Sequence, residues 1–167
     1  IIQGSDPDGD PIKIEIFGEP ISITASPADY SPKNTFQPQP GIVNFRWQTI
    51  CNHVRAREYE VRVRISDRPR SGPSLVDIQT WRIKVVGPPP VWDELIQQPG
   101  RTVELKWDPY ECANSASEMQ IWRRINSDPY EPDSCETGIR PGYTLVGITN
   151  METFSFTDLN GGEGLAP

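Results

Sequence analysis

Three aspartates lie within five residues near the start of the chain, in the run Ser5-Asp6-Pro7-Asp8-Gly9-Asp10. Carboxylates do not bury themselves without partners, so either water or a hard cation must take up this charge. Calcium is the cation that carboxylate and carbonyl oxygens bind best in such turns. Asp, Pro and Gly are also the residues that ordinary solvated turns use. The run therefore predicts either a calcium half-site formed by Asp6, Asp8 and Asp10, or a solvated turn.

The spacing of this run excludes an EF-hand. Counting from Asp6, the glycine is the fourth residue rather than the sixth, and the twelfth residue is Phe17 rather than a glutamate. The turn itself offers fewer oxygens than the six to eight that calcium takes, so other groups would have to complete the site. Backbone carbonyls, a preceding module and Asp67 are the candidates for these additional ligands.

Few other residues have the types and spacing that catalysis needs. His53 is the only histidine, and no Cys-x-x-Cys pair is present, so a zinc site has no adequate ligand set. Cys51 and His53 lie two residues apart where a strand ends, which is a poor arrangement for a nucleophile and its base. The chain also lacks a Gly-x-Ser-x-Gly sequence, a P-loop and a dinucleotide-binding fingerprint. We therefore predict a protein without enzymatic activity.

Tryptophans are the second group of candidate contact residues. Trp47, Trp81 and Trp107 are in phase with neighbouring apolar residues and are expected in the core. Trp122 is out of phase with the apolar residues of its own strand, and Trp92 follows a triple proline. These two side chains are candidates for contact with a ligand such as a sugar, and ordinary packing between domains is the alternative.

The elements that must position these residues are strands. Alternation of apolar and polar residues with a period of two predicts antiparallel strands that expose one face to water. In the first half the predicted strands are 12–16, 21–24, 43–47, 59–65 and 81–85, and the proline-rich stretch 25–41 is expected to be an irregular loop. In the second half they are 103–107, 119–124, 143–148 and 153–157.

A triple proline separates the two halves. Consecutive prolines favour a stiff polyproline II segment and cannot continue a central strand. We therefore expect a β-sandwich over residues 1–87, a linker over 88–90 and a second sandwich over 91–167. Four strands are fewer than the roughly seven of an immunoglobulin-type sandwich. The predicted fold class is all-β, with two tandem immunoglobulin-like sandwiches that are both truncated at the outer ends.

Composition points to an extracellular chain. The formal net charge of −7 disfavours nucleic acid and anionic membranes as partners, and no apolar run is long enough to span a bilayer. Cys112 and Cys135 lie in the same half of the chain in loop-like surroundings, and they are expected to form a disulfide in an oxidising compartment. Two free thiols are the alternative. Cys51 would then be either a buried thiol or a cysteine that pairs outside this stretch of sequence.

The first half resembles cadherin-like and PKD-like bacterial repeats. The likeness lies in the strand, acidic turn and alternating strand of 1–17, and in the Tyr-x-Val-x-Val strand, Asp-containing loop and final strand of 59–86. The resemblance implies calcium ligands at Asp6, Asp8 and Asp10, with Asp67 as a weaker candidate. Two features depart from the cadherin pattern, because the acidic exit linker is replaced by prolines and no LDRE-like element is present.

The second half resembles a fibronectin type III module, through its proline-rich start, the 103–107 strand with its tryptophan, and the strands at 119–124 and 153–159. The tandem also resembles the large surface proteins of Bacteroidetes, of the gliding-motility adhesin type exported by the type IX system. That resemblance implies a structural or adhesive role at the bacterial cell surface. The implied partners are other domains of the same chain and secretion-machinery or cell-surface proteins or glycans. The alternative is a carbohydrate-binding accessory region of a secreted glycan-degrading enzyme.

Overall fold

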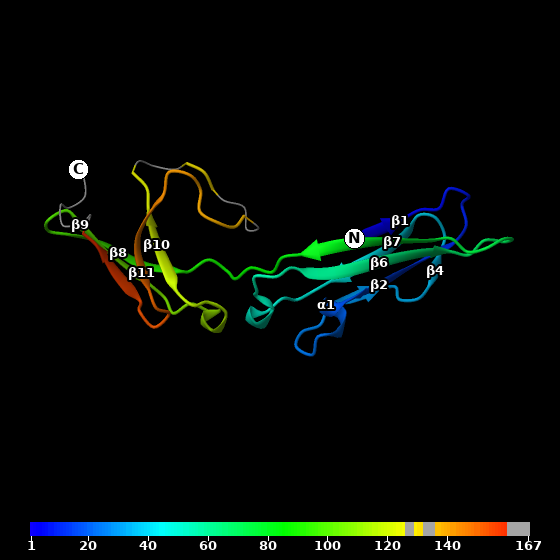
Figure 1. Ribbon diagram of the computed structural model, residues 1–167, viewed down its shortest axis with the longest axis horizontal. Coiled ribbons are helices and arrows are strands. Elements are labelled where there is room, and N and C mark those ends of the chain that lie inside the picture. Colours follow the sequence, from blue (N-terminus) through cyan, green and yellow to red (C-terminus); the bar gives the residue numbers. More distant parts are fainter. Residues whose placement is uncertain (126–128, 132–135, 160–167) are drawn as a thin grey trace. The chain divides into compact units, whose positions relative to one another are not determined.

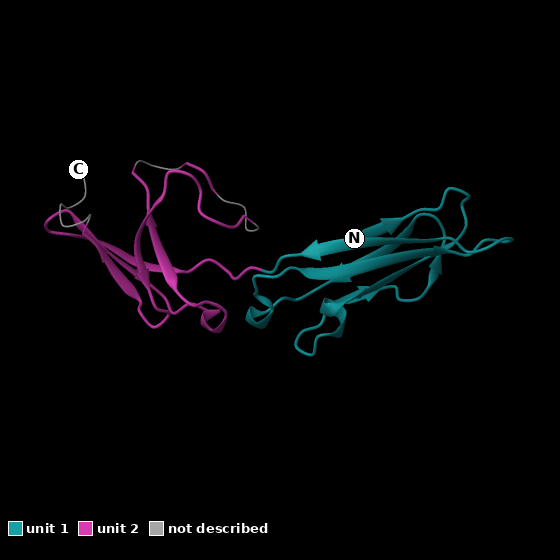
Figure 2. Ribbon diagram, viewed as in Figure 1, with its two compact units in different colours: residues 1–85 teal, residues 86–167 magenta. Residues whose placement is uncertain are grey.

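The computed structural model describes residues 1–125, 129–131 and 136–159. The fold is all-β, with antiparallel sheets and three short helical segments in the described residues (Figure 1). The chain divides into two compact units, Ile1–Val85 and Val86–Pro167 (Figure 2). We call them the first unit and the second unit. That each is an independently folding domain remains a prediction.

The first unit contains two antiparallel sheets, of strand order β1-β5-β3 and β4-β2-β6-β7. Their elements are β1 (Ile2–Gly4), β2 (Ile12–Gly18), α1 (Glu19–Ser22), β3 (Asp29–Ser31), β4 (Phe36–Gln37), β5 (Gly41–Arg46), the 3-10 helix η1 (Cys51–His53), β6 (Tyr59–Asp67) and β7 (Val76–Ile83). Alternate residues of β2 and β6 are buried, as period-two patterning predicts. Both sheets contribute to the core, which therefore lies between them as in a sandwich. Its buried residues are Ile12, Ile14, Ile16, Tyr30, Val43, Val61 and Val63.

Two local predictions for the first unit are wrong. The stretch 21–24 is not a strand, because the chain turns into α1 at Glu19, where Pro20 occupies the first helical turn and is buried. Proline is well tolerated there, since its fixed φ suits a helix and its missing N–H would have no partner in the first turn. The stretch 25–41 is not wholly irregular either, because β3 and β4 form short ladders with their neighbours.

Trp81 is not a core residue, although its phase predicts one. It lies opposite the buried Val61 and its ring packs edge-on against Phe45, with ring centroids 5.3 Å apart. However, it remains 45% exposed because β7 is the last strand of its sheet. The phase of a residue in the apolar–polar alternation predicts which face of the sheet its side chain lies on. It does not predict how far its strand lies from the edge of the sheet.

The second unit contains a sheet of order β12-β9-β8 and the pair β10-β11. Its elements are β8 (Trp92–Gln98), β9 (Thr102–Trp107), the 3-10 helix η2 (Ala113–Ser115), β10 (Met119–Arg123), β11 (Thr144–Thr149) and β12 (Ser155–Asp158). The four predicted strands are all present, and β8 is an additional one. An irregularity in the register between Trp92 and Glu94 explains why β8 was missed, since an extra residue breaks the alternation that reveals a strand.

Packing inside the second unit brings its two sheets together. Trp107 of β9 and Ile121 of β10 are both buried. Gly147 of β11 lies against the ring of Phe156 of β12, so closely that a Cβ atom would collide with the ring. Within the described residues, the helices are all too short and too polar to cross a bilayer.

The proline segment before β8 packs on the second unit. The hydroxyl of Tyr110 donates a hydrogen bond to the carbonyl of Pro88, at 3.0 Å. A Cβ atom on Gly87 would collide with that same hydroxyl, so the close approach requires glycine. Because Pro89 and Pro90 also line a cavity of this unit, these prolines belong to its surface rather than forming only a spacer.

Candidate aromatic binding site

Three tryptophans from three different strands line one cavity of about 280 Å³ in the second unit. Trp92 comes from β8, Trp107 from the end of β9 and Trp122 from β10. The strands therefore bring together the two tryptophans that the sequence marked as candidate contacts. The complete lining is Pro89, Pro90, Trp92, Trp107, Met119, Gln120, Ile121 and Trp122.

Trp92 and Trp107 form one wall of this cavity. They lie directly opposite each other in the antiparallel pair β8-β9. Their ring centroids are 6.4 Å apart and their planes meet at 86°, the edge-to-face arrangement that aromatic pairs favour. Trp107 is buried, whereas Trp92 is 64% exposed. The buried ring therefore holds the exposed one in position, and Trp92 presents a large surface to solvent.

Trp122 is positioned by a hydrogen bond and by an irregular strand. Its indole N–H donates to the side-chain oxygen of Gln120, at 3.0 Å. The register of β10 against β11 shifts between Ile121 and Trp122, as at a β-bulge. Bulges change the direction in which a side chain points. This shift explains how Trp122 can lie half-buried beside the cavity although its phase in the sequence predicts the opposite face from Ile121.

The lining of this cavity is similar in composition to that of small-molecule sites, which are mostly apolar and aromatic with a few polar groups. Flat indole rings suit ligands with an apolar face, such as the C–H face of a sugar ring. In the described part of the chain, the polar groups of the lining are the amide of Gln120, whose oxygen accepts from the Trp122 indole N–H, and the indole N–H groups.

The acidic turn has a different local role. The Oδ1 atom of Asp6 accepts hydrogen bonds from the backbone N–H groups of Asp8, at 3.0 Å, and Asp10, at 3.3 Å. The backbone N–H of Gly9 donates to the Asp6 carbonyl, at 3.2 Å. Gln39 clamps the turn from outside by accepting from the Asp6 N–H and donating to the Asp10 carbonyl. The Asp6 carboxylate thus stabilises the turn in which it lies, as Asp commonly does.

Asp67 is occupied in the same way. It is buried, and its Oδ1 atom accepts hydrogen bonds from the hydroxyl of Ser74, at 3.0 Å, and from the backbone N–H of Leu75. These bonds close the loop between β6 and β7. In the described ranges, no group of three or more His, Cys, Asp or Glu residues is arranged to hold a metal ion. Asp6 and Asp67 are thus bonded within their own loops, and calcium binding remains a prediction from the resemblance.

His53 and Cys51 are structural residues. Both nitrogens of the buried imidazole are engaged, since Nδ1 accepts from the Ile50 N–H at 3.1 Å and Nε2 lies 2.9 Å from the Ala25 carbonyl. The centroid of this ring also lies 5.0 Å from that of the Trp47 ring. Cys51 is disulfide-bonded, so it is not the free buried thiol considered from sequence. This pair therefore provides neither a free nucleophile nor a free base.

The other cysteine prediction conflicts with the structure. Cys112 is buried, and both Cys112 and Cys51 are disulfide-bonded. Cys135, the predicted partner of Cys112, lies outside the described residues. Since the chain has three cysteines, a bond between Cys112 and Cys135 would leave no cysteine for the disulfide of Cys51, so the predicted pairing is wrong.

Comparisons with protein-family models, with curated proteins and with solved structures find no match to this chain.

Proposed function

We propose that this chain is a non-enzymatic, adhesive and structural region of an extracellular bacterial surface protein, made of two immunoglobulin-like sandwiches. The observation that carries the proposal is the cavity that gathers Trp92, Trp107 and Trp122 in the second unit. An exposed tryptophan fixed against a buried one offers a rigid contact surface that loses little conformational entropy on binding. We propose a surface glycan as the ligand.

Two further observations support an extracellular location. Cys51 and Cys112 are disulfide-bonded, and disulfides persist mainly in oxidising compartments. The net charge of −7 suits a protein of the cell surface better than one that binds nucleic acid. In this proposal the first unit serves as the structural element of the repeat, since its core lies between its two antiparallel sheets.

The second candidate function uses the same cavity. A carbohydrate-binding accessory region of a glycan-degrading enzyme would also need a tryptophan-lined contact surface without catalytic carboxylates. The two candidates differ in the protein to which the region is attached. Hydrolysis of a bound glycan by the complete precursor, and not by this region, would favour the accessory role.

A glycan array with the whole chain tests the proposed ligand class. We expect Trp122→Ala to weaken binding at least about tenfold, since truncating a central aromatic contact commonly costs about 2 kcal/mol or more. Trp81→Ala is the matched control, because Trp81 is a partly exposed tryptophan of the first unit and does not line the cavity. Binding that is absent, or that both variants weaken equally while remaining folded, would contradict the proposal.

A further inference from the structure

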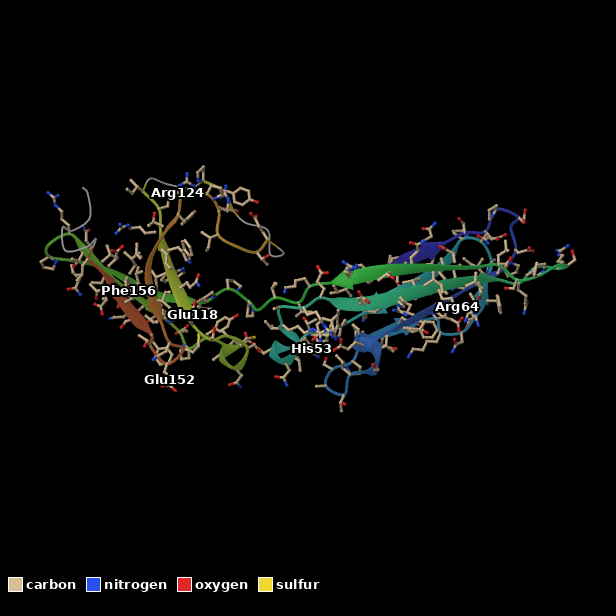
Figure 3. All side chains as sticks on the ribbon, viewed as in Figure 1. His53, Arg64, Glu118, Arg124, Glu152 and Phe156 are labelled. Atoms are coloured by element: carbon tan, nitrogen blue, oxygen red, sulfur yellow. The ribbon has the colours of Figure 1, made fainter. Side chains whose placement is uncertain are left out.

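A second cavity of the second unit also has Trp122 in its wall. Its volume is about 270 Å³, and it lies beside the end of β10 and the segment that leads into β11. In Figure 3 this end of β10 is found at the labelled Arg124, which follows the strand, and the opposite end at Glu118, which precedes it. The lining is Trp122, Tyr130, Glu136, Gly138, Ile139, Arg140 and Tyr143.

This second cavity differs in chemistry from the first. The hydroxyl of Tyr130 donates a hydrogen bond to the carboxylate of Glu136, which raises the pKa of the phenol. The guanidinium of Arg140 lies over the ring of Tyr130, with its central carbon 3.8 Å from the ring centroid. A hydroxyl, a carboxylate and a guanidinium together provide both donors and acceptors. Among the described residues that line the first cavity, the polar groups are the amide of Gln120 and the indole N–H groups of the tryptophans.

The sizes of the two cavities point to a ligand that engages both. Each is slightly smaller than the roughly 300–1,000 Å³ of ordinary ligand cavities. Either one alone accommodates a single small unit. Because Trp122 lines both, a ligand unit against this ring can lie next to a second unit in the neighbouring cavity.

We propose that the two cavities are adjacent subsites for one oligosaccharide of at least two sugar units. One unit packs its apolar face on Trp92 and Trp122, and the next forms hydrogen bonds with Tyr130, Glu136 and Arg140. This inference depends on the proposed function and adds the length of the ligand to it. Sugar hydroxyls suit this mixture of donors and acceptors, since a hydroxyl both donates and accepts.

A proline-rich peptide is the other ligand that aromatic surfaces commonly bind. It suits the second cavity less well, because proline has no backbone N–H to donate to the carboxylate of Glu136. The polar groups therefore favour the sugar. A proline decapeptide serves as the competing probe in the experiment below.

Calorimetry on the whole chain with oligomers of increasing length tests the inference. The probes are cello-, chito- and manno-oligosaccharides of one to four units. We expect the affinity for the sugar type that binds to rise about tenfold or more from one unit to two or three, because the second contact becomes intramolecular. Arg140→Ala should remove this gain with length, whereas Trp122→Ala should weaken binding at every length.

The outcomes separate this inference from the proposed function. Trp122-dependent binding that does not change with length, or that Arg140→Ala leaves intact at every length, would overturn the two-subsite inference alone. Failure of every oligosaccharide to bind would overturn the proposed function as well. Tighter binding of the proline decapeptide would assign the site to a peptide. Arg70→Ala, at an exposed loop residue of the first unit, controls for a general effect of losing one cation. The length series is measured on the unmodified chain, so its result does not depend on whether a variant folds.

Discussion

Arg123 and Asp158 form an ion pair that joins the two sheets of the second unit. The Nη1 atom of Arg123, at the end of β10, donates to both carboxylate oxygens of Asp158, at the end of β12, at 2.8 Å each. Asp158 is buried and Arg123 is largely covered. Since β10 pairs with β11 and β12 pairs with β9, this contact connects strands that no backbone ladder joins.

Removing the acid of this pair should destabilise the second unit strongly. We expect Asp158→Ala to lower the free energy of unfolding by about 3 kcal/mol, because the cation would remain in a poorly solvated place without its partner. Urea denaturation followed by tryptophan fluorescence measures the loss. Glu94→Ala is the control within the same unit, since it breaks the exposed pair with Lys106, where the N–O distance is 3.2 Å. That exposed pair should contribute less than about 1 kcal/mol, and equal losses in the two variants would contradict the prediction.

The acidic turn should depend on one oxygen atom of Asp6. Asp6→Ala removes the acceptor of two backbone N–H groups, and we expect it to cost about 1 kcal/mol. Asp6→Asn keeps an oxygen at the same place and should melt close to the unmodified chain. Asp8→Ala is the control, because the exposed Asp8 is bonded in the turn through its backbone. Thermal melting of the three variants in a chelating buffer gives the comparison, and an Asn variant as unstable as the Ala variant would contradict it.

Calcium binding can be tested on the same turn. If calcium binds there, as the resemblance to cadherin-like repeats implies, adding it should raise the melting temperature and a chelator should reverse the effect. The double variant Asp6→Asn and Asp8→Asn should abolish the difference, because amides lack the charge that calcium requires. Identical melting curves with calcium and with chelator would end the calcium prediction.

The pair between Glu19 and Arg55 should make stability depend on pH in the acid range. Arg55 donates to both oxygens of Glu19, with Nη2 2.7 Å from Oε2, and this lowers the pKa of Glu19 below its usual 4.5. A lowered pKa in the folded state gives a contribution that is complete above about pH 4.5 and is lost as the pH falls through the folded value. At pH 7 we expect Glu19→Gln to cost at most about 1 kcal/mol, because the pair is partly exposed.

Urea midpoints between pH 7 and pH 2 check this dependence. The difference between the unmodified chain and Glu19→Gln should stay constant down to about pH 4.5 and then shrink. Glu58→Gln is the control, since this exposed side chain is three residues from Arg55 and lines a cavity of the first unit together with Glu19. If the difference between the two chains grew as the pH falls, the pKa of Glu19 would not be lowered in the folded state and the prediction would be wrong.

Peptide mapping should find both Cys51 and Cys112 oxidised. Alkylation of the unreduced protein, followed by digestion and mass spectrometry, should leave these two cysteines unmodified, because both are disulfide-bonded. The same map identifies the partner of each cysteine, and a linked peptide pair of Cys112 with Cys135, which the sequence predicts, would also contradict the structure. Alkylation of Cys51 before reduction would contradict the structure.

Several parts of the fold could be predicted because neighbouring residues encode them. The alternation Ile12, Ile14, Ile16 in β2 and Tyr59, Val61, Val63 in β6 determines which side of each strand is buried. The helix α1 and the strand β8 could not be found in this way, because each is defined by a local exception. A proline in the first turn begins the helix, and an irregular pair of residues interrupts the strand.

By itself, the sequence determined the all-β class and singled out Trp92 and Trp122 as residues outside the core pattern. Only the tertiary structure decided that these two rings share a cavity with Trp107 and that a second, more polar cavity begins at Trp122. It also decided that Asp6 is bonded to its own turn and Asp67 to a separate loop. The physical reason is that periodicity depends on neighbours along the chain, whereas a site depends on which strands pair and on how their side chains meet across the sheets.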